Sequence, residues 1–345
     1  MAFLHRDLLG PGNPKRQGTA AFRPSPKPSI PCCPGERYEL ETKGRNTENP
    51  PVQFRKATLI GVGMLGGSFG LALRKRRLAR NVTGFVRRAR SVRECVAHGA
   101  VDEATLDLAE AVHGADLVIL CTPLAQMKSL AKRLAPHLEP GALVTDVGSV
   151  KASVLRDIEP VVSRAGAHFV ASHPMAGSEK AGVLAARADL FADAICIITP
   201  TKKTRPAALM RTEQLWKALG SGILKMTPVM HDQLVSRSSH LPYLSSVALT
   251  NCILDPAHST TQGLLCAGGF RDTTRIASSS PEMWRDIALA NRRYIRQALA
   301  SYLRQLVKLD TMLKHGEGDR LAACFQKAKT LRDAWFAEAS PRLPK

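Results

Sequence analysis

Three glycines in the stretch ATLIGVGMLGGSFGLAL stand at the spacing G-x-G-x-x-G, after an apolar run and at the start of a helical one. In that context the first glycine permits a tight turn, the second lets the backbone approach a pyrophosphate, and the third lets helix and strand pack closely. The amino end of the helix then offers free N–H groups to phosphate. A tight turn without a ligand is the alternative. We expect a dinucleotide site formed by Gly61, Val62, Gly63, Met64, Leu65, Gly66 and, after a later apolar run, Thr122.

The end of the second predicted strand bears on the choice between NAD and NADP. NAD-binding folds usually carry Asp or Glu there, which hydrogen-bonds the ribose 2′-hydroxyl. This chain reads GFVRRARS, with Val86 in place of the acid and Arg87 and Arg88 just after it. Guanidinium groups bind a 2′-phosphate bidentately, whereas a carboxylate repels it. The sequence therefore favours NADP, with NAD still possible, unless these arginines are only a solvated helix start.

Further polar residues lie in three later stretches. Ser149 in TDVGSVK and His173 in SHPMAGSEKAG follow predicted strands, and open α/β sheets bind ligands at the carboxyl ends of their strands. His240 lies in SRSSHLPYLSS, while Arg271 and Arg275 lie in GGFRDTTRIASSSPEMWRDI. Each residue alone has a structural explanation, and a lone buried histidine is more often structural than functional. Together they describe a pocket that suits an enzyme oxidising an alcohol on a di-anionic substrate.

Short apolar runs rich in β-branched residues alternate with helical stretches over residues 56–203. Near-continuously apolar strands separated by helices are typical of a parallel sheet covered on both faces, so this part predicts a Rossmann-type, doubly wound α/β domain. After about Lys203 the strand runs stop and long segments of helical period follow. We expect an all-helical substrate and dimerisation domain over residues 204–340, because long helices with apolar stripes need a packing partner.

Composition limits the class of protein. The chain has 49 basic and 29 acidic residues and a net charge of +20, but the charges interleave, aromatic residues make up 5%, and no nucleic-acid-binding motif is present. We therefore expect no nucleic acid partner. The eight cysteines lack ligand spacing, which predicts neither a metal nor a disulfide framework. The sequence has no apolar run as long as a membrane span, so we expect a cytoplasmic protein without a membrane partner.

Residues 1–55 are rich in Pro, Gly, Arg and Lys and lack a sustained apolar period. Such a segment buries too little apolar surface to offset its chain entropy, so we expect a disordered basic extension. A basic start poor in acids also resembles an organelle transit peptide. We see no amphipathic helix in it and favour the plain extension.

Several motifs in a fixed order carry a family resemblance. GxGxxGxS, TDVGSVK, SHPMAGSE, SHLP and FRDTTRIA with PEMWRDI follow one another between Lys56 and about Leu313. In this order the chain resembles the prephenate and arogenate dehydrogenases of tyrosine biosynthesis. The resemblance implies a Rossmann domain followed by a helical domain that forms a homodimer. It also implies oxidative decarboxylation of prephenate to 4-hydroxyphenylpyruvate, or of arogenate to tyrosine, with hydride transfer to NAD(P)+ and no metal.

The same resemblance assigns roles to the candidate residues. It implies that His173 hydrogen-bonds the substrate hydroxyl and assists as base, and that Ser149 orients both that hydroxyl and His173. Neutral imidazole suits this role because its ordinary pKa lies near the working pH. Arg275 would pair with a substrate carboxylate, and His240 and Arg271 would line the substrate side of the cleft. The missing acid after the second strand departs from the pattern expected for NAD.

Other interpretations stay open at this point. A β-hydroxyacid or imine reductase has a similar two-domain build, but it does not explain SHPMAGSE followed by SHLP, and such relatives usually carry a catalytic Lys in the helical domain. A non-catalytic NADP-binding sensor or a basic nucleic-acid binder would belong to another class. Turnover of prephenate discriminates, because neither alternative predicts it. Prephenate and arogenate differ only at the side-chain ketone or amine, and the sequence does not separate them.

Overall fold

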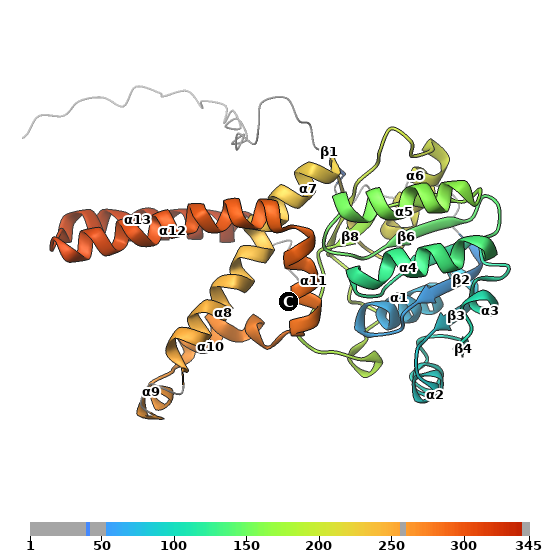
Figure 1. The fold of residues 1–345 in the computed structure, drawn as a ribbon, viewed down its shortest axis with the longest axis horizontal. Coiled ribbons are helices and arrows are strands. Elements are labelled where there is room, and N and C mark those ends of the chain that lie inside the picture. The colour runs from blue at the N-terminus through green and yellow to red at the C-terminus, as the bar shows by residue number, and fades with distance from the viewer. Residues whose placement is uncertain (1–38, 42–52, 256–259, 340–345) are drawn as a thin grey trace, which may run out of the picture. The chain divides into compact units, whose positions relative to one another are not determined.

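The computed structural model describes residues 39–41, 53–255 and 260–339 (Figure 1). Most of the predicted extension, residues 1–38 and 42–52, lies outside the described residues. Its described part departs from the prediction of disorder, because β1 (Glu39–Glu41) pairs with a later strand and the first long strand begins at Phe54. Among the described residues, no helix is long and apolar enough to cross a membrane.

A six-stranded parallel sheet in the order β4-β3-β2-β5-β6-β7 forms the first part of the fold, which confirms the predicted Rossmann-type architecture. Its strands are β2 (Phe54–Ile60), β3 (Ala79–Phe85), β4 (Glu103–Thr105), β5 (Leu117–Leu120), β6 (Leu143–Asp146) and β7 (His168–Val170). The chain moves outward in one direction from β2 to β4 and in the other from β5 to β7. The order therefore reverses between β2 and β5, and open α/β sheets bind ligands at such a switch point.

Helices cover both faces of this sheet (Figure 1). They are α1 (Met64–Lys75), α2 (Ala89–Ala97), α3 (Leu108–Val112), α4 (Leu124–Leu134), α5 (Ala152–Arg164) and α6 (Pro206–Ala218). Successive strand side chains point to opposite faces, so Leu59 and Ile60 enter different cores. The core around Leu59 contains Phe69 and Trp216, whose ring centroids lie 5.2 Å apart. The core around Ile60 is closed by α3, α4 and α5.

A smaller sheet, in the order β1-β10-β9-β8, combines β1, which precedes the parallel sheet along the chain, with three strands that follow it. It contains β8 (Ser172–Pro174), β9 (Ile195–Ile198) and β10 (Gly222–Lys225). The run HFVASHP is divided between β7 of the large sheet and β8 of the small one. The prediction that strands stop after about Lys203 is wrong, because β10 pairs in parallel with β9. Helix α6 likewise packs Trp216 into the core beside Phe69.

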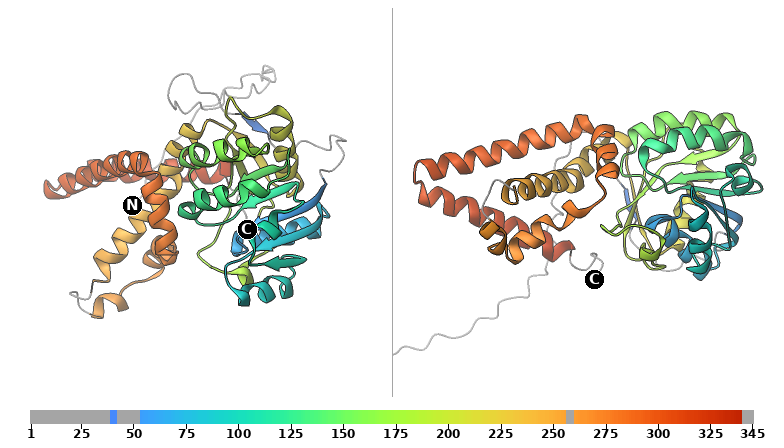
Figure 2. Two further views of the ribbon diagram at one scale, coloured as in Figure 1. Left: turned by 45° about the vertical axis from the view of Figure 1, so that its right-hand side comes forward. Right: turned by 60° about the horizontal axis from the view of Figure 1, so that its bottom comes forward.

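From Pro228 onward the described chain forms only helices and turns, as predicted (Figure 2). The helices are α7 (Pro228–Val235), α8 (Leu241–Ile253), α9 (Thr260–Leu264), α10 (Gly268–Thr274), α11 (Pro281–Ala290), α12 (Arg292–Lys314) and α13 (Gly318–Ala339). Short 3-10 turns are η1 (Ala135–His137), η2 (Val183–Ala185) and η4 (Arg275–Ser278). Helices α12 and α13 expose large apolar side chains, including Val307 (62%), Phe325 (59%) and Leu331 (63%).

A π-turn, η3 (Ser236–His240), joins α7 to α8 without a break in the helix. The N–H of Leu241 donates to the carbonyl of Ser236, five residues back. Pro242 follows directly, and its ring clashes with a carbonyl four residues back in a regular α-helix, so a wider turn is favoured here. The turn ends at His240, which is 1% exposed. Such π-turns occur frequently at functional sites.

Candidate active site

The glycine loop after β2 has the geometry of a pyrophosphate cradle. Gly61 has a φ of +95°, in the region that favours glycine, and a Cβ there would come within 2.9 Å of Cγ2 of Thr122. At Gly66 a Cβ would lie 2.1 Å from the carbonyl oxygen of Gly61. A Cβ at Gly63 would meet no atom within 4 Å. The loop thus combines a tight turn at Gly61, open space beside Gly63 and close packing of the helix at Gly66, which are the three features that a dinucleotide loop needs.

The amino end of α1 is left uncapped. Gly63 is its N-cap, no side chain bonds its first turn, and that turn holds no acidic residue. The N–H groups of Met64 and Leu65 therefore face outward without an intrahelical partner. The hydroxyl of Thr122 is buried and lacks a hydrogen-bond partner among the described residues. Unpartnered donors, a buried hydroxyl and open space at Gly63 fit an anionic pyrophosphate.

Val62 and the arginine pair occupy different surroundings. The Val62 side chain is 8% exposed and belongs to the sheet core, so its backbone is the part that can face a ligand. Val86 is also buried, and its N–H donates to the carbonyl of Thr105. Arg87 and Arg88 follow it on the surface, and no ion pair or hydrogen bond engages either guanidinium within the described chain. Helix α2 begins directly after them with no acidic residue in its first turn.

A buried ion pair joins Lys151 to Asp146 next to the start of β8. Lys151 and Asp146 are both fully buried, and the Lys151 ammonium bonds an Asp146 carboxylate oxygen. The same ammonium donates to the Ser172 carbonyl at 2.7 Å, and the Ser172 N–H donates to Asp146 at 3.2 Å. The N–H of Gly148 also donates to Asp146, at 2.9 Å. These bonds satisfy a buried charge pair and fix the start of β8, the strand that carries His173.

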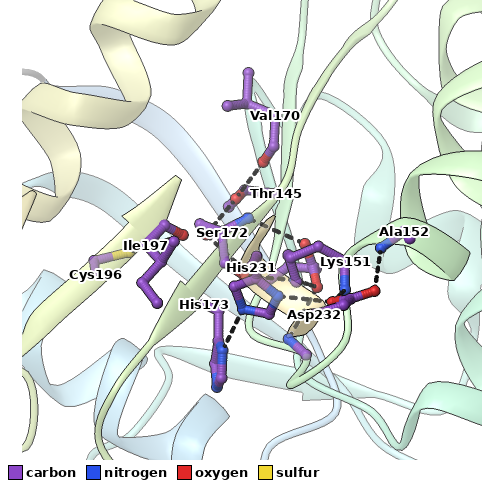
Figure 3. A network of polar contacts seen from close by, with 12 residues as sticks. Thr145, Lys151, Ala152, Val170, Ser172, His173, Cys196, Ile197, His231 and Asp232 are labelled. Atoms are coloured by element: carbon purple, nitrogen blue, oxygen red, sulfur yellow. Dashed lines mark hydrogen bonds and ion pairs between the residues drawn. The ribbon is translucent and has the colours of Figure 1, made fainter. Parts of the chain in front are cut away.

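His173 is the first of three polar side chains that lie in a row (Figure 3). Its Nδ1 lies 2.8 Å from Nε2 of His231, and Nδ1 of His231 lies 2.7 Å from Oδ1 of Asp232. The Asp232 carboxylate also accepts the N–H groups of Lys151 at 2.8 Å and Ala152 at 3.0 Å. His173 comes from β8, while His231 and Asp232 come from α7. The row therefore joins the small sheet to the first helix of the helical part.

Burial sets the charge of these histidines. It lowers the pKa of His173 well below its ordinary value, and the neighbouring His231 and Lys151 lower it further. Burial also lowers the pKa of His231, against the opposing effect of its hydrogen bond to Asp232. At neutral pH both rings are therefore uncharged, which leaves His173 able to accept a proton.

His240 lies near this row, held by Asn291. The Asn291 side-chain amide donates to the Asp232 carbonyl at 2.8 Å and lies 3.2 Å from Nδ1 of His240. Nδ1 of His240 is thus an acceptor, and its Nε2 carries the proton. That Nε2 is buried without a partner among the described residues, and so is Nε1 of Trp284, whose ring lies 5.9 Å from that of His240. Burial, with the nearby His231, lowers the pKa of His240 to about 4.

The other predicted site residues make no hydrogen bond to His173 or His240 among the described residues. Ser149 is half-buried and makes no hydrogen bond to His173 in the described chain, where His231 engages the Nδ1 of that ring. Arg275 is 61% exposed and pairs with Glu179 at 2.8 Å. Arg271 is 79% exposed and pairs with Asp272 at 3.2 Å. Both arginines are therefore committed to carboxylates of this chain, and their roles toward a substrate stay predictions.

Comparison with known protein families shows the family to which this chain belongs. Residues 69–225 match the family described as prephenate dehydrogenase, nucleotide-binding domain, and residues 227–327 match prephenate dehydrogenase, dimerization domain. The chain belongs to the prephenate dehydrogenase family. It is accordingly an oxidoreductase of the dehydrogenase class.

Individual relatives agree with this membership. The prephenate dehydrogenase of Bacillus subtilis is 35% identical over 80% of this chain and 74% of its own length. The cyclohexadienyl dehydrogenase of Zymomonas mobilis is 32% identical over 81% of this chain and 95% of its own. Among solved structures, prephenate dehydrogenase from A. aeolicus, in complex with hydroxyphenyl propionate and NAD+, superposes with a TM-score of 0.75 at 31% identity, covering 81% of this chain and 98% of that one. Synechocystis arogenate dehydrogenase gives 0.67 at 32%, covering 81% and 99%.

The sequence analysis did not name three residues that the structure brings next to His173 and His240. His231 and Asp232 lie in PVMHDQLV, which forms the helix α7, and Asn291 lies at the start of the long helix α12. One signal was available, because a His–Asp pair inside an apolar helical run places two polar groups where burial is expected. Buried polar groups need partners, and here those partners are His173 and the amino end of α5.

Proposed function

We propose that this chain catalyses the oxidative decarboxylation of prephenate, with arogenate as the alternative substrate, using a nicotinamide cofactor. The observation that carries the proposal is the buried, neutral His173, in a chain that belongs to the prephenate dehydrogenase family. His231 engages Nδ1 of His173, and no described residue bonds its Nε2. That nitrogen is therefore free for a substrate hydroxyl.

The chemistry follows from the protonation states. A nicotinamide cofactor, when bound, supplies the acceptor for the hydride that leaves the ring carbon carrying the hydroxyl. His173 accepts the hydroxyl proton at Nε2 as that carbon becomes a carbonyl, and Ser149 orients the hydroxyl. Departure of the ring carboxylate as CO2 then leaves an aromatic ring. The glycine loop, the first turn of α1 and Thr122 hold the pyrophosphate.

Substrate carboxylates would be bound by cationic and N–H donors on the helical part. We assign to this role Arg271, Arg275 and His240, whose Nε2–H has no partner among the described residues. Because Arg275 already pairs with Glu179, a substrate carboxylate would have to displace that partner. Replacing Arg275 by Ala should mainly raise KM, since a charge-assisted hydrogen bond contributes roughly 1.5–3 kcal/mol. An unchanged KM at saturating cofactor would remove Arg275 from the site.

Steady-state assays with each substrate and each cofactor test the proposed reaction. Production of NADH or NADPH is followed with prephenate and arogenate, and a 3-hydroxy acid serves as the control substrate for a β-hydroxyacid dehydrogenase. We expect turnover with prephenate, with arogenate, or with both. Turnover of the 3-hydroxy acid alone would refute the proposal, and so would binding of cofactor with no turnover of any of these substrates.

We also propose that NADP is preferred over NAD. No described residue pairs with the guanidinium groups of Arg87 and Arg88, Val86 leaves no carboxylate to repel a 2′-phosphate, and the amino end of α2 adds partial positive charge. A contact of roughly 1.5–3 kcal/mol corresponds to about a 10- to 100-fold preference in kcat/KM. Changing both arginines to Ala should remove it, while Arg90→Ala on the same helix should not. Equal use of NAD and NADP by the parent enzyme would refute this proposal.

The exposed apolar side chains of α12 and α13 support a homodimer, in keeping with the dimerization domain that this region matches. We place the boundary of that domain after Lys225, because β10 pairs with β9 and α7 begins at Pro228. Sedimentation should give a dimer for the parent. Val307→Glu with Leu331→Glu should give a monomer, whereas Lys132→Glu on α4 should stay dimeric. A monomeric parent would contradict the assignment.

A further inference from the structure

We propose that His231 and Asp232 form an exit path for the substrate proton, which leaves His173 through His231 toward Asp232 and the cavity beside it. The inference rests on the proposed function, because it needs a hydroxyl whose proton is removed. Neither residue would contact the substrate, so both act through His173.

The direction of the two hydrogen bonds in the row follows from the Asp232 carboxylate, which can only accept. The Asp232 carboxylate accepts two backbone N–H groups, from Lys151 and Ala152, and a carboxylate can only accept from His231 as well. Nδ1 of His231 therefore carries its proton, and its Nε2 is an acceptor. That acceptor takes the Nδ1–H of His173, so the lone pair of His173 is on Nε2, facing away from the row.

The charges around the row favour movement of the proton outward. A positive charge on His173 lies near Lys151 and His240, and no carboxylate hydrogen-bonds its ring. A positive charge on His231 is instead stabilised by Asp232 at 2.7 Å, with Asp146 also contributing. An imidazolium is therefore more stable at His231 than at His173.

The step balances without a further reactant. The substrate O–H bond breaks as hydride passes to the nicotinamide, and the proton joins Nε2 of His173. The Nδ1–H bond of His173 then breaks as that proton joins Nε2 of His231. The Nδ1 proton of His231 passes to Asp232 and from there to water. Loss of CO2 leaves the product oxygen as a phenolate, which takes the Nε2 proton of His173 while water returns a proton through Asp232 and His231 to Nδ1 of His173. The row thus regains its starting tautomers, and the whole reaction releases no net proton.

A cavity lies at the end of this path. Its volume is about 600 Å³, and α4, α5, α11 and α12 contribute its lining. Asp232, Ala152 and Asn291 line it together with the charged residues Asp286 and Arg293, whereas His173 and His231 do not. Asp232 is thus the one member of the row that borders this cavity. His173 is 8% exposed, and a bound substrate would cover the side of it that faces the reaction.

The first experiment determines the tautomers in the parent enzyme. Protein labelled with 15N at histidine is studied by two-bond 1H–15N correlation at neutral pH, with His173→Asn and His231→Gln spectra for assignment. We expect both rings to carry their proton on Nδ1. A His173 ring protonated on Nε2 would overturn the proposal, and this measurement does not depend on turnover.

The second experiment replaces His231 by Gln, whose amide can hold His173 in place but cannot pass a proton, and by Ala, which leaves space for an added base. We expect kcat to fall about 10²-fold with an unchanged KM in both, because a positioned proton-transfer group typically contributes about 10²- to 10⁴-fold. The D2O effect on kcat should rise, and imidazole should restore activity to His231→Ala in proportion to its free-base fraction. His168→Gln, on β7 and outside the row, is the matched control.

Two outcomes would overturn the exit path. One is a His231→Gln enzyme with the kcat and D2O effect of the parent. The other is a low kcat that neither imidazole nor pH changes, since that pattern belongs to a residue that only supports the fold. A parent enzyme that turns over neither prephenate nor arogenate would instead refute the proposed function, and the tautomer measurement would still stand as the test of the row.

Discussion

Replacing His240 by Gln should make the stability of this enzyme less sensitive to acid. The His240 ring is 1% exposed, its Nδ1 accepts from Asn291, and burial together with the nearby His231 lowers its pKa to about 4. Asp232 opposes this effect without cancelling it. The native state therefore keeps His240 neutral at a pH where the unfolded chain already binds a proton.

The magnitude follows from the two pKa values. An unfolded histidine titrates near 6.5, so between pH 6.5 and about 4 the unfolded state holds more protons, and the free energy of unfolding falls as the pH falls. The loss begins as the pH drops through 6.5 and is complete near 4. Between pH 7.5 and 5 it amounts to about 2 kcal/mol, at roughly 1.36 kcal/mol for each unit of separation.

Urea unfolding followed by tryptophan fluorescence at pH 7.5, 6.5 and 5 measures this effect. The parent should lose about 2 kcal/mol more than His240→Gln over that interval, because His173 and His231 titrate in both proteins and cancel in the comparison. His137→Gln, at an exposed position, should behave like the parent. If the parent and His240→Gln lost the same free energy of unfolding, His240 would not be a buried neutral ring.

Three further predictions concern the glycine loop, the buried ion pair and the proposed base. Gly66→Ala should abolish NADPH binding and lower Tm, because its Cβ would lie 2.1 Å from a backbone oxygen. Gly63→Ala should keep the parent Tm and weaken only cofactor binding, because its Cβ would meet no atom within 4 Å. Fluorescence titration measures the binding of NADPH, and thermal unfolding measures Tm. Lys151→Met should lower the free energy of unfolding in urea by about 3–5 kcal/mol, since it leaves Asp146 without its buried cation, and a loss near zero would contradict that role. His173→Asn should lower kcat by about 10²- to 10⁴-fold in the steady-state assay with cofactor affinity retained, and a change of only a few-fold would exclude it as the base.

The large sheet was predictable because its signals are local. Apolar runs such as that of β5 are buried over their whole length, and the glycine loop fixes where a strand turns into a helix. The small sheet was not, because β10 has four residues directly after α6, and a helical window covers both. The division of HFVASHP between β7 and β8 depends on pairing with β9, whose partner residues lie more than 20 positions away.

The site residues also differ in whether a local sequence signal identifies them. His173 could be found because its motif surrounds it, whereas its partner His231 lies 58 positions away on another element. The structure also gives TDVGSVK a second meaning, since Asp146 and Lys151 from this motif bond Ser172 from both its N–H and its carbonyl. The Lys151 N–H bonds Asp232 at the other end of the row. TDVGSVK, which the sequence analysis singled out for Ser149, thus positions both His173, through Ser172, and Asp232. Changes at Lys151 should therefore lower activity by displacing the histidine row, as well as lowering the stability of the fold.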